Sequence, residues 1–182
     1  MRLIKITNPN QRDIDIAEEL GKKSFSEEEY LSIKYCITNN EYEVYFIYLD
    51  GNIFGGYIIT KIYDNIVYLF FITIQETLRD LGIGTEALNS LNDIYKDKII
   101  YVDIEMVDIN KEDVERKKRK LFYLNNGYKV TGWFLSYYNE YYEILINKEP
   151  IDINKFKALM NSINTDKKDF NMEFFNIIPN KN

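Results

Sequence analysis

The 182-residue chain contains no histidine and only one cysteine, Cys36. The absence of histidine excludes Ser-His-Asp and Cys-His catalysis, excludes histidine-ligated zinc and removes the commonest general base. A single cysteine excludes an internal disulfide and any multi-cysteine metal site, so we predict no metal. Cys36 lies in a helical pattern and is interpreted as a small core residue. Any chemistry must therefore use tyrosine, carboxylates, lysine, backbone amides, bound water or a cofactor.

Long hydrophobic runs and excess positive charge are also missing. The longest apolar stretch, Ile66–Ile74, is much shorter than the roughly 20 residues that a membrane-spanning helix needs. The first residues lack the apolar region and cleavage site of a signal peptide. A net charge of −6 argues against a nucleic-acid binder, which would carry a basic face. We therefore predict a cytoplasmic protein with neither a nucleic-acid nor a membrane partner.

What is present is the composition of an ordinary globular protein, with 46% hydrophobic and 29% charged residues. The length suits one domain, and neither an internal repeat nor a Gly/Ser linker divides the chain. We predict a domain over residues 1–149 and a C-terminal helix and tail over 150–182, packed on or appended to it. The final residues are polar with a few aromatics, and they carry no clear pattern of an element.

Hydrophobic periodicity and turn residues predict a series of strands and helices. Strands are expected at 2–7, 42–49, 53–63, 66–74, 99–106, 128–138 and 141–147. Helices are expected at about 14–25, 26–38, 82–95, 113–126 and 156–163. The segment 66–74 is apolar on both faces, which favours a central position in a sheet. Hairpins first and a βαβ unit later predict a mixed α/β sheet that is antiparallel at first.

The strongest local signal is Arg79–Thr85, which lies between the central strand and a predicted helix. Glycines at a helix start let the backbone approach a ligand, and free N–H groups there favour a phosphate or pyrophosphate. A tight turn without a ligand is the simpler alternative. Gly82, Gly84 and Ala87 also match a dinucleotide fingerprint, with Asp103 about 20 residues further on. That interpretation is disfavoured because three hairpin-linked strands precede the glycines.

The segment Ile74–Leu88 resembles motif A of the GNAT acetyltransferases, V-x-P-x-x-R-G-x-G-I-G-x-x-L-L. The matches to the family signature Q/R-x-x-G-x-G/A are Arg79, Gly82, Ile83 and Gly84. Glu76 stands where the family has proline, and Asp80 where it often has glycine. Both departures lie in the loop before the helix and leave the glycines intact.

A second segment, Arg119–Tyr128, is similar to motif B, in which a tyrosine sits four residues before Gly-Phe. Tyr123 occupies that position, and Tyr128 replaces the phenylalanine. Together with Tyr101–Glu105 and Glu115–Arg119, the segment resembles a bacterial GNAT subgroup reading L-L-E-V-E, an acidic loop, then R-x-x-F-Y-x-x-x-G-F. The two motifs occur at the spacing that the family shows.

The resemblance covers about Arg2 to Ile146 and implies the GNAT fold. That fold has a mixed, mostly antiparallel central sheet with flanking helices, and the strands at 66–74 and 99–106 splay apart in it. The helix beyond residue 150 would be an addition. The resemblance also implies an N-acetyltransferase that uses acetyl-CoA as co-substrate and a primary amine as direct attacker. The amine would belong to a small molecule or a protein, and the enzyme would be a monomer or a homodimer.

The resemblance further implies roles for particular residues. Backbone groups of Ile72, Thr73 and Ile74 would pair with pantetheine and orient the thioester carbonyl. The amides that would hold the pyrophosphate belong to Arg79, Asp80, Leu81, Gly82, Ile83, Gly84 and Thr85. Tyr123 would protonate the departing thiolate as a general acid near its normal pKa, unless it is only a packing residue of its helix.

The general base is left open. Many family members place a glutamate on the central strand where this chain has Phe70. Asp103 and Glu105 share one strand face and are the expected substitutes, while solvated edge charges or a water chain to the surface are alternatives. The missing carboxylate also leaves room for a second function, a catalytically weak CoA-binding or interaction module with the same fold.

Overall fold

The computed structural model describes residues 1–27, 29–107, 113–137, 140–163 and 172–176. The chain divides into two compact units. The first contains Met1–Ile62 and Val67–Lys96, and the second contains Tyr63–Ile66 and Asp97–Asn182. The predicted division into 1–149 and 150–182 stays a prediction.

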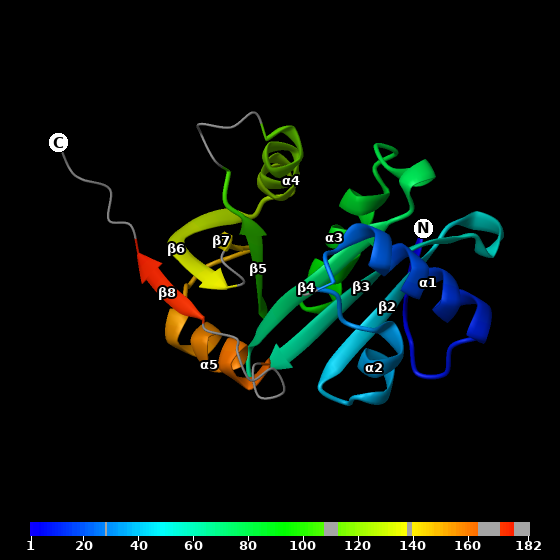
Figure 1. Ribbon diagram of the computed structural model, residues 1–182, viewed down its shortest axis with the longest axis horizontal. Coiled ribbons are helices and arrows are strands. Elements are labelled where there is room, and N and C mark those ends of the chain that lie inside the picture. The colour runs from blue at the N-terminus through cyan, green and yellow to red at the C-terminus, as the bar shows by residue number, and fades with distance from the viewer. Residues whose placement is uncertain (28, 108–112, 138–139, 164–171, 177–182) are drawn as a thin grey trace. The chain divides into compact units, whose positions relative to one another are not determined.

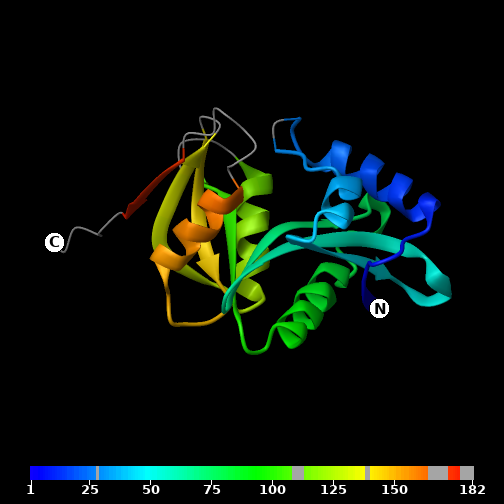
Figure 2. The same cartoon turned by 90° about the horizontal axis from the view of Figure 1, so that it is seen from below.

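The first unit has strands in the order β1-β2-β3-β4 with helices on both faces. Its strands are β1 (Arg2–Lys5), β2 (Tyr42–Tyr48), β3 (Phe54–Tyr63) and β4 (Ile66–Ile74). Its helices are α1 (Gln11–Ser24), α2 (Ile33–Thr38) and α3 (Ile83–Ile94), with short 3₁₀ turns at Asp50–Asn52 and Glu76–Leu78. In Figure 2, α1 and α2 lie over one face of the strands and α3 lies over the other.

The two turns between the first long strands form where the sequence predicts them. Gly51 has φ +72° between β2 and β3, and Asp64 has φ +54° between β3 and β4. Glycine, aspartate and asparagine tolerate this left-handed region better than other residues do, so local chemistry decides both turns.

Cys36 lies in the core between the helices and the sheet of the first unit. It packs with Ala17 of α1, Phe46 of β2 and Tyr57 of β3, and all four are fully buried. Burial raises the pKa of the Cys36 thiol to about 12, so the thiolate is not formed at neutral pH. The interpretation of Cys36 as a core residue is confirmed.

The second helix was expected to begin after Ser26, but α2 begins at Ile33. Ser26 and Glu29 do form the reciprocal bonds of a capping box, at 3.3 and 3.4 Å, yet these bonds close only one turn. The start of α2 is fixed by the Ser32 cap, whose side chain accepts from the N–H of Tyr35, together with a tertiary contact. Glu18 of α1 accepts a hydrogen bond from the backbone N–H of Lys34 at 3.0 Å and so anchors the first turn of α2.

The second unit is an antiparallel sheet with the strand order β5-β7-β6-β8 (Figure 1). Its strands are β5 (Ile99–Glu105), β6 (Lys129–Tyr137), β7 (Glu140–Ile146) and β8 (Glu173–Asn176). Its helices are α4 (Val114–Asn125) and α5 (Ile153–Ile163). The predicted last position of β6, Tyr138, lies outside the described residues.

Helices α4 and α5 lie over opposite faces of these strands. Lys120 of α4 pairs with Glu143, which is the cross-strand partner of Ile104 in β5. The ring of Tyr101 stacks on Phe156 of α5, with centroids 4.7 Å apart. Because successive side chains of a strand point to opposite faces, Tyr101 and Ile104 lie on opposite faces of β5.

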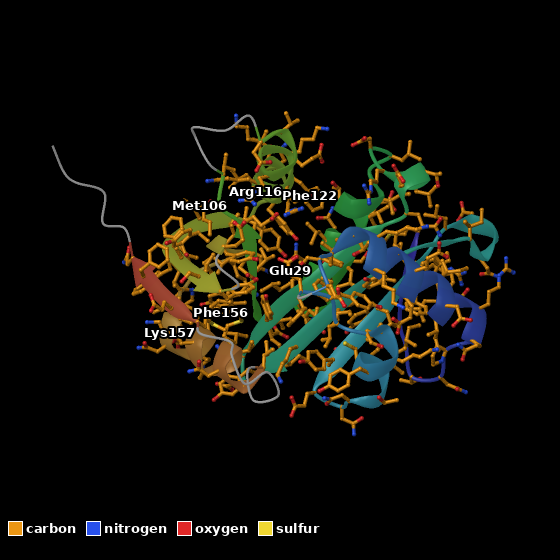
Figure 3. The ribbon with its side chains drawn as sticks, viewed as in Figure 1. Glu29, Met106, Arg116, Phe122, Phe156 and Lys157 are labelled. Carbon is orange, nitrogen blue, oxygen red and sulfur yellow. The ribbon has the colours of Figure 1, made fainter. Side chains whose placement is uncertain are left out.

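Strand β8 was missed at the sequence level, where the polar C-terminal end was expected to carry no element. It pairs with β6 in antiparallel register, and Phe175 stacks on Phe134 with ring centroids 5.5 Å apart. Lys157, labelled in Figure 3, lies over the rings of Trp133 and Phe174 at 4.9 and 5.3 Å. A strand this short is stabilised by its partner strand and its ring contacts rather than by its own sequence.

Both units consist of strands with flanking helices, so the predicted α/β fold class is confirmed. The splay between β4 and β5 stays a prediction. Among the described residues, the helices are all too short or too polar to cross a membrane.

Phe156 gives the first testable prediction. Its side chain, labelled in Figure 3, is fully buried, and its ring stacks on that of Tyr101. Phe156→Leu should lower the free energy of unfolding by about 1–2 kcal/mol, because it loses the aromatic pair and part of the packing. Urea denaturation measures the change. Leu121→Ala, at a side chain that is 55% exposed, is the control and should stay within about 0.5 kcal/mol. Equal effects of both changes would show that α5 is not docked through Phe156.

Candidate functional site

The start of α3 is an open helix terminus. Gly82 is the N-cap residue and has the left-handed conformation (φ +80°, ψ −3°). It has no side chain that could cap the helix. The first helical bond runs from Glu86 N to Gly82 O at 3.0 Å. The N–H groups of Ile83, Gly84 and Thr85 precede that bond, so they have no acceptor inside the helix. With the helix dipole they can hold an anion.

The backbone around Gly82 leaves room for a ligand. A Cβ added to Gly82 would meet no other atom within 4 Å. Leu81 is 67% exposed, whereas Ile83 is only 7% exposed and fixes the first turn of α3 to the core. Asp80 also has a positive φ, +61°, which turns the chain into the helix. Ile83 thus anchors α3 to the core, while Leu81 and Gly82 leave the N-terminal turn of the helix accessible.

The last residues of β4 lead into this turn. Thr73 is buried, while Ile72 and Ile74 are partly buried. The Ile74 carbonyl accepts a hydrogen bond from Nε of Arg79 at 3.3 Å. Arg79 therefore ties the loop to the end of the strand in this structure, a role that the sequence did not suggest.

Tyr123 lies in the last turn of α4 and is only 4% exposed. Its ring packs edge-on against Phe122 at 5.2 Å and Tyr128 at 5.3 Å. Burial raises the pKa of Tyr123 above its usual value. The charge of Arg119 lowers this pKa and that of Asp103 raises it. The sequence-based expectation of a normal pKa is therefore wrong, although a phenol with a raised pKa keeps the proton that it would donate.

The two candidate bases on β5 have different surroundings. Asp103 accepts a hydrogen bond from the hydroxyl of Tyr137 at 2.7 Å. Glu105 forms ion pairs with two residues of α4, with Arg116 at 3.3 Å and with Arg119. Arg116 also donates to the carbonyl of Met106 at 3.3 Å, and Figure 3 labels both residues where β5 ends near α4. Both carboxylate oxygens of Glu105 are therefore engaged by guanidinium groups of α4.

Phe70, at the position where many relatives carry a glutamate, belongs to an aromatic cluster. It contacts Tyr42 at 6.1 Å, Tyr68 at 5.2 Å and Phe71 at 4.7 Å between ring centroids. The neighbourhood of Phe70 is therefore aromatic, which accords with a base elsewhere in the chain. Sequence reasoning also missed Tyr137 of β6, the partner of Asp103, because no motif marks a tyrosine that lies two strands away in the sheet.

A glycine-capped helix start that follows a buried strand and a short loop suits a phosphate-bearing cofactor. The chain belongs to the acetyltransferase (GNAT) family, whose model matches residues 8–115. The matched residues include the start of α3 as well as Asp103 and Glu105, and Tyr123 lies beyond them.

Solved structures share this fold at low sequence identity. A protein described as a GNAT-family acetyltransferase from Bacteroides thetaiotaomicron is 19% identical, with a TM-score of 0.71 over 91% of this chain and 97% of its own. An aminoglycoside 6'-N-acetyltransferase in complex with coenzyme A is 18% identical, with a TM-score of 0.63 over 84% and 100%. The ribosomal-protein-S18-alanine N-acetyltransferase from Escherichia coli is 15% identical, with a TM-score of 0.59 over 80% and 92%. No curated protein sequence matches the chain.

Membership in this family makes the chain an acetyltransferase, and acetyl-CoA is its co-substrate. The residues at the start of α3 fit this co-substrate, because free amides and a missing side chain suit its pyrophosphate.

Proposed function

We propose that the chain is an N-acetyltransferase that transfers the acetyl group of acetyl-CoA to a primary amine by direct attack. The observation that carries the proposal is the open, glycine-capped start of α3 in a chain of this family. The names of two structural neighbours mention an aminoglycoside and a protein alanine, so we propose an amine of a small molecule or a protein as acceptor. A bacterial origin, a cytoplasmic location and a monomeric or homodimeric state are further proposals.

The proposed reaction assigns a task to each part of the chain. The amides of Arg79 to Thr85 hold the pyrophosphate, and the backbone of Ile72 to Ile74 orients the thioester. The amine nitrogen attacks the carbonyl carbon, and the C–S bond breaks as the tetrahedral intermediate collapses. Tyr123 donates its proton to the sulfur, and the amine proton leaves to a base. Tyr123 then regains a proton from water.

We propose Asp103 rather than Glu105 as the base, because both carboxylate oxygens of Glu105 already pair with arginines of α4. Asp103→Asn should lower kcat/KM for the amine about tenfold at neutral pH. The loss should be smaller than the usual contribution of a base, because part of the amine loses its proton without help. Steady-state assays across pH measure the effect. Glu105→Gln is the comparison and should change kcat/KM less. A larger loss in Glu105→Gln would reverse the assignment.

The experiment that tests the function is an amine panel assayed for release of the CoA thiol. The panel should contain a polyamine, an aminoglycoside, an amino acid and a peptide with a free N-terminus. Thiol release with one of these amines, and not without it, supports the proposal. CoA binding without thiol release for any amine would favour the alternative, a CoA-binding module, which the aromatic surroundings of Phe70 make the second candidate.

A further inference from the structure

Strand β3 contains a bulge at the pair Gly55-Gly56. Ile47 of β2 pairs with Gly56, but the next residue, Tyr48, pairs with Phe54, so Gly55 is an extra residue in β3. A bulge bends its strand locally and is frequent beside functional sites. Two adjacent glycines remove both side chains at this point.

Gly56 lies unusually close to the end of β4. Its φ is +153°, which side-chain-bearing residues rarely adopt. A Cβ added to Gly56 would lie 2.0 Å from the carbonyl oxygen of Thr73 and 3.0 Å from the Cα of Ile74. Because a real Cβ stays at least about 3 Å from such an oxygen, any side chain here must move the Thr73 carbonyl by roughly 1 Å.

Gln75, the residue directly after β4, holds β3 and the end of β4 together. Gln75 donates from its backbone N–H to the carbonyl of Gly55 at 2.9 Å. Its side-chain Nε2 donates to the carbonyl of Phe54 at 2.6 Å. The β3 segment Phe54–Gly56 therefore holds the end of β4 through two hydrogen bonds and one close backbone approach.

We infer that Gly56 is a positioning residue for acetyl-CoA. Its missing side chain lets β3 set the position of the Thr73 carbonyl and the adjoining backbone of Ile72–Ile74. This inference rests on the proposed function, in which that backbone orients the thioester. A displacement of about 1 Å at a reacting group can cost up to a hundredfold in rate, so the close approach at Gly56 bears directly on catalysis.

The test compares two neighbouring glycines. Gly56→Ala should raise the KM for acetyl-CoA and the Kd for CoA about tenfold, with a lower kcat and an unchanged KM for the amine. Gly55→Ala is the matched control. Its Cβ would meet Ile47 at 3.4 Å, on the side of β2, so both constants should stay within about twofold of wild type. Unchanged acetyl-CoA constants in Gly56→Ala, or equal effects of the two variants, would overturn the inference.

A second variant keeps the test decisive if Gly56→Ala does not fold. Gln75→Leu removes the bond to the Phe54 carbonyl without a backbone collision, and should raise the KM for acetyl-CoA about fivefold. An unchanged KM would contradict the positioning role of this segment. Wild-type protein that binds no CoA would instead refute the proposed function itself. If wild type turns over normally and the acetyl-CoA constants of Gly56→Ala equal those of wild type, only this inference is refuted.

Discussion

Replacing Tyr123 by phenylalanine should lower turnover by about a hundredfold, while the Kd for CoA stays within about twofold of wild type. Phenylalanine keeps the ring and its contacts with Phe122 and Tyr128 but removes the only proton that the side chain can donate. The amides proposed to hold the pyrophosphate lie in another part of the chain, so binding should survive. The loss should lie at the lower end for a general acid, because a thiol with a pKa of about 8.5 leaves readily without help.

Tyr128→Phe is the matched control for Tyr123→Phe. Tyr128 is 2% exposed, touches Tyr123, and has no hydrogen-bond partner for its hydroxyl among the described residues. Removing a buried hydroxyl without a partner should leave both turnover and stability nearly unchanged. Equal turnover in wild type and Tyr123→Phe would make Tyr123 a packing residue. A parallel loss of stability and CoA binding would lead to the same conclusion.

The pH profile adds an independent readout for Tyr123. Burial disfavours the phenolate, so the folded-state pKa is raised and the donating form persists to higher pH than for an exposed tyrosine. Activity that depends on this proton should therefore fall only above the ordinary tyrosine range, near pH 10. A basic limb well below that range would point to a different acid.

Gly82→Asp should abolish the stabilisation of the protein by CoA. Wild type should gain roughly 2.7 kcal/mol of unfolding free energy when free CoA is at a hundredfold excess over its Kd. The new carboxylate would lie among the amides at the start of α3, where it would repel a pyrophosphate and occupy its place. Thermal denaturation with and without CoA measures the gain. If the variant gains as much unfolding free energy from CoA as wild type does, the phosphate is not bound at the start of α3.

Two controls separate charge from backbone strain in Gly82→Asp. Gly82→Asn places a neutral side chain at the same φ of +80°. This variant should keep more of the stabilisation by CoA. Gly51→Asp places aspartate at φ +72° in the turn between β2 and β3, where a Cβ would also meet no atom within 4 Å. It should lower stability without changing the CoA response. A loss of that response in Gly51→Asp would show that strain alone explains the effect.

The features predicted correctly from the sequence depend on neighbouring residues in the chain. The turns at Gly51 and Asp64 follow from which residues accept positive φ, and β4 follows from a run that is apolar on both faces. The start of α3 at Gly82 follows from glycines that come directly before a helical stripe. These signals act over a few residues, so a single sequence displays them completely.

The features that were missed depend on partners far away in the chain. The first turn of α2 is held by Glu18 of α1 in addition to its local Ser32 cap, and β8 pairs with the edge that β6 offers. The sequence could place Asp103 and Glu105 on one strand face, but only the folded chain brings two arginines to Glu105 and Tyr137 to Asp103. Charges at strand ends show no periodicity that would reveal their partners.

By itself, the sequence determined the class of this protein and its co-substrate, because two separated segments, Ile74–Leu88 and Arg119–Tyr128, resemble motifs of one family at the family's spacing. The glycine-bearing helix start taken alone indicates only an anion site. The tertiary structure alone decided which partners Asp103 and Glu105 meet, that the pKa of Tyr123 is raised, and how closely Gly56 approaches Thr73. These properties depend on burial and on distances between atoms of different elements. Such distances are set only when the elements pack together, since the electrostatic and contact energies that act over them change steeply within a few ångströms.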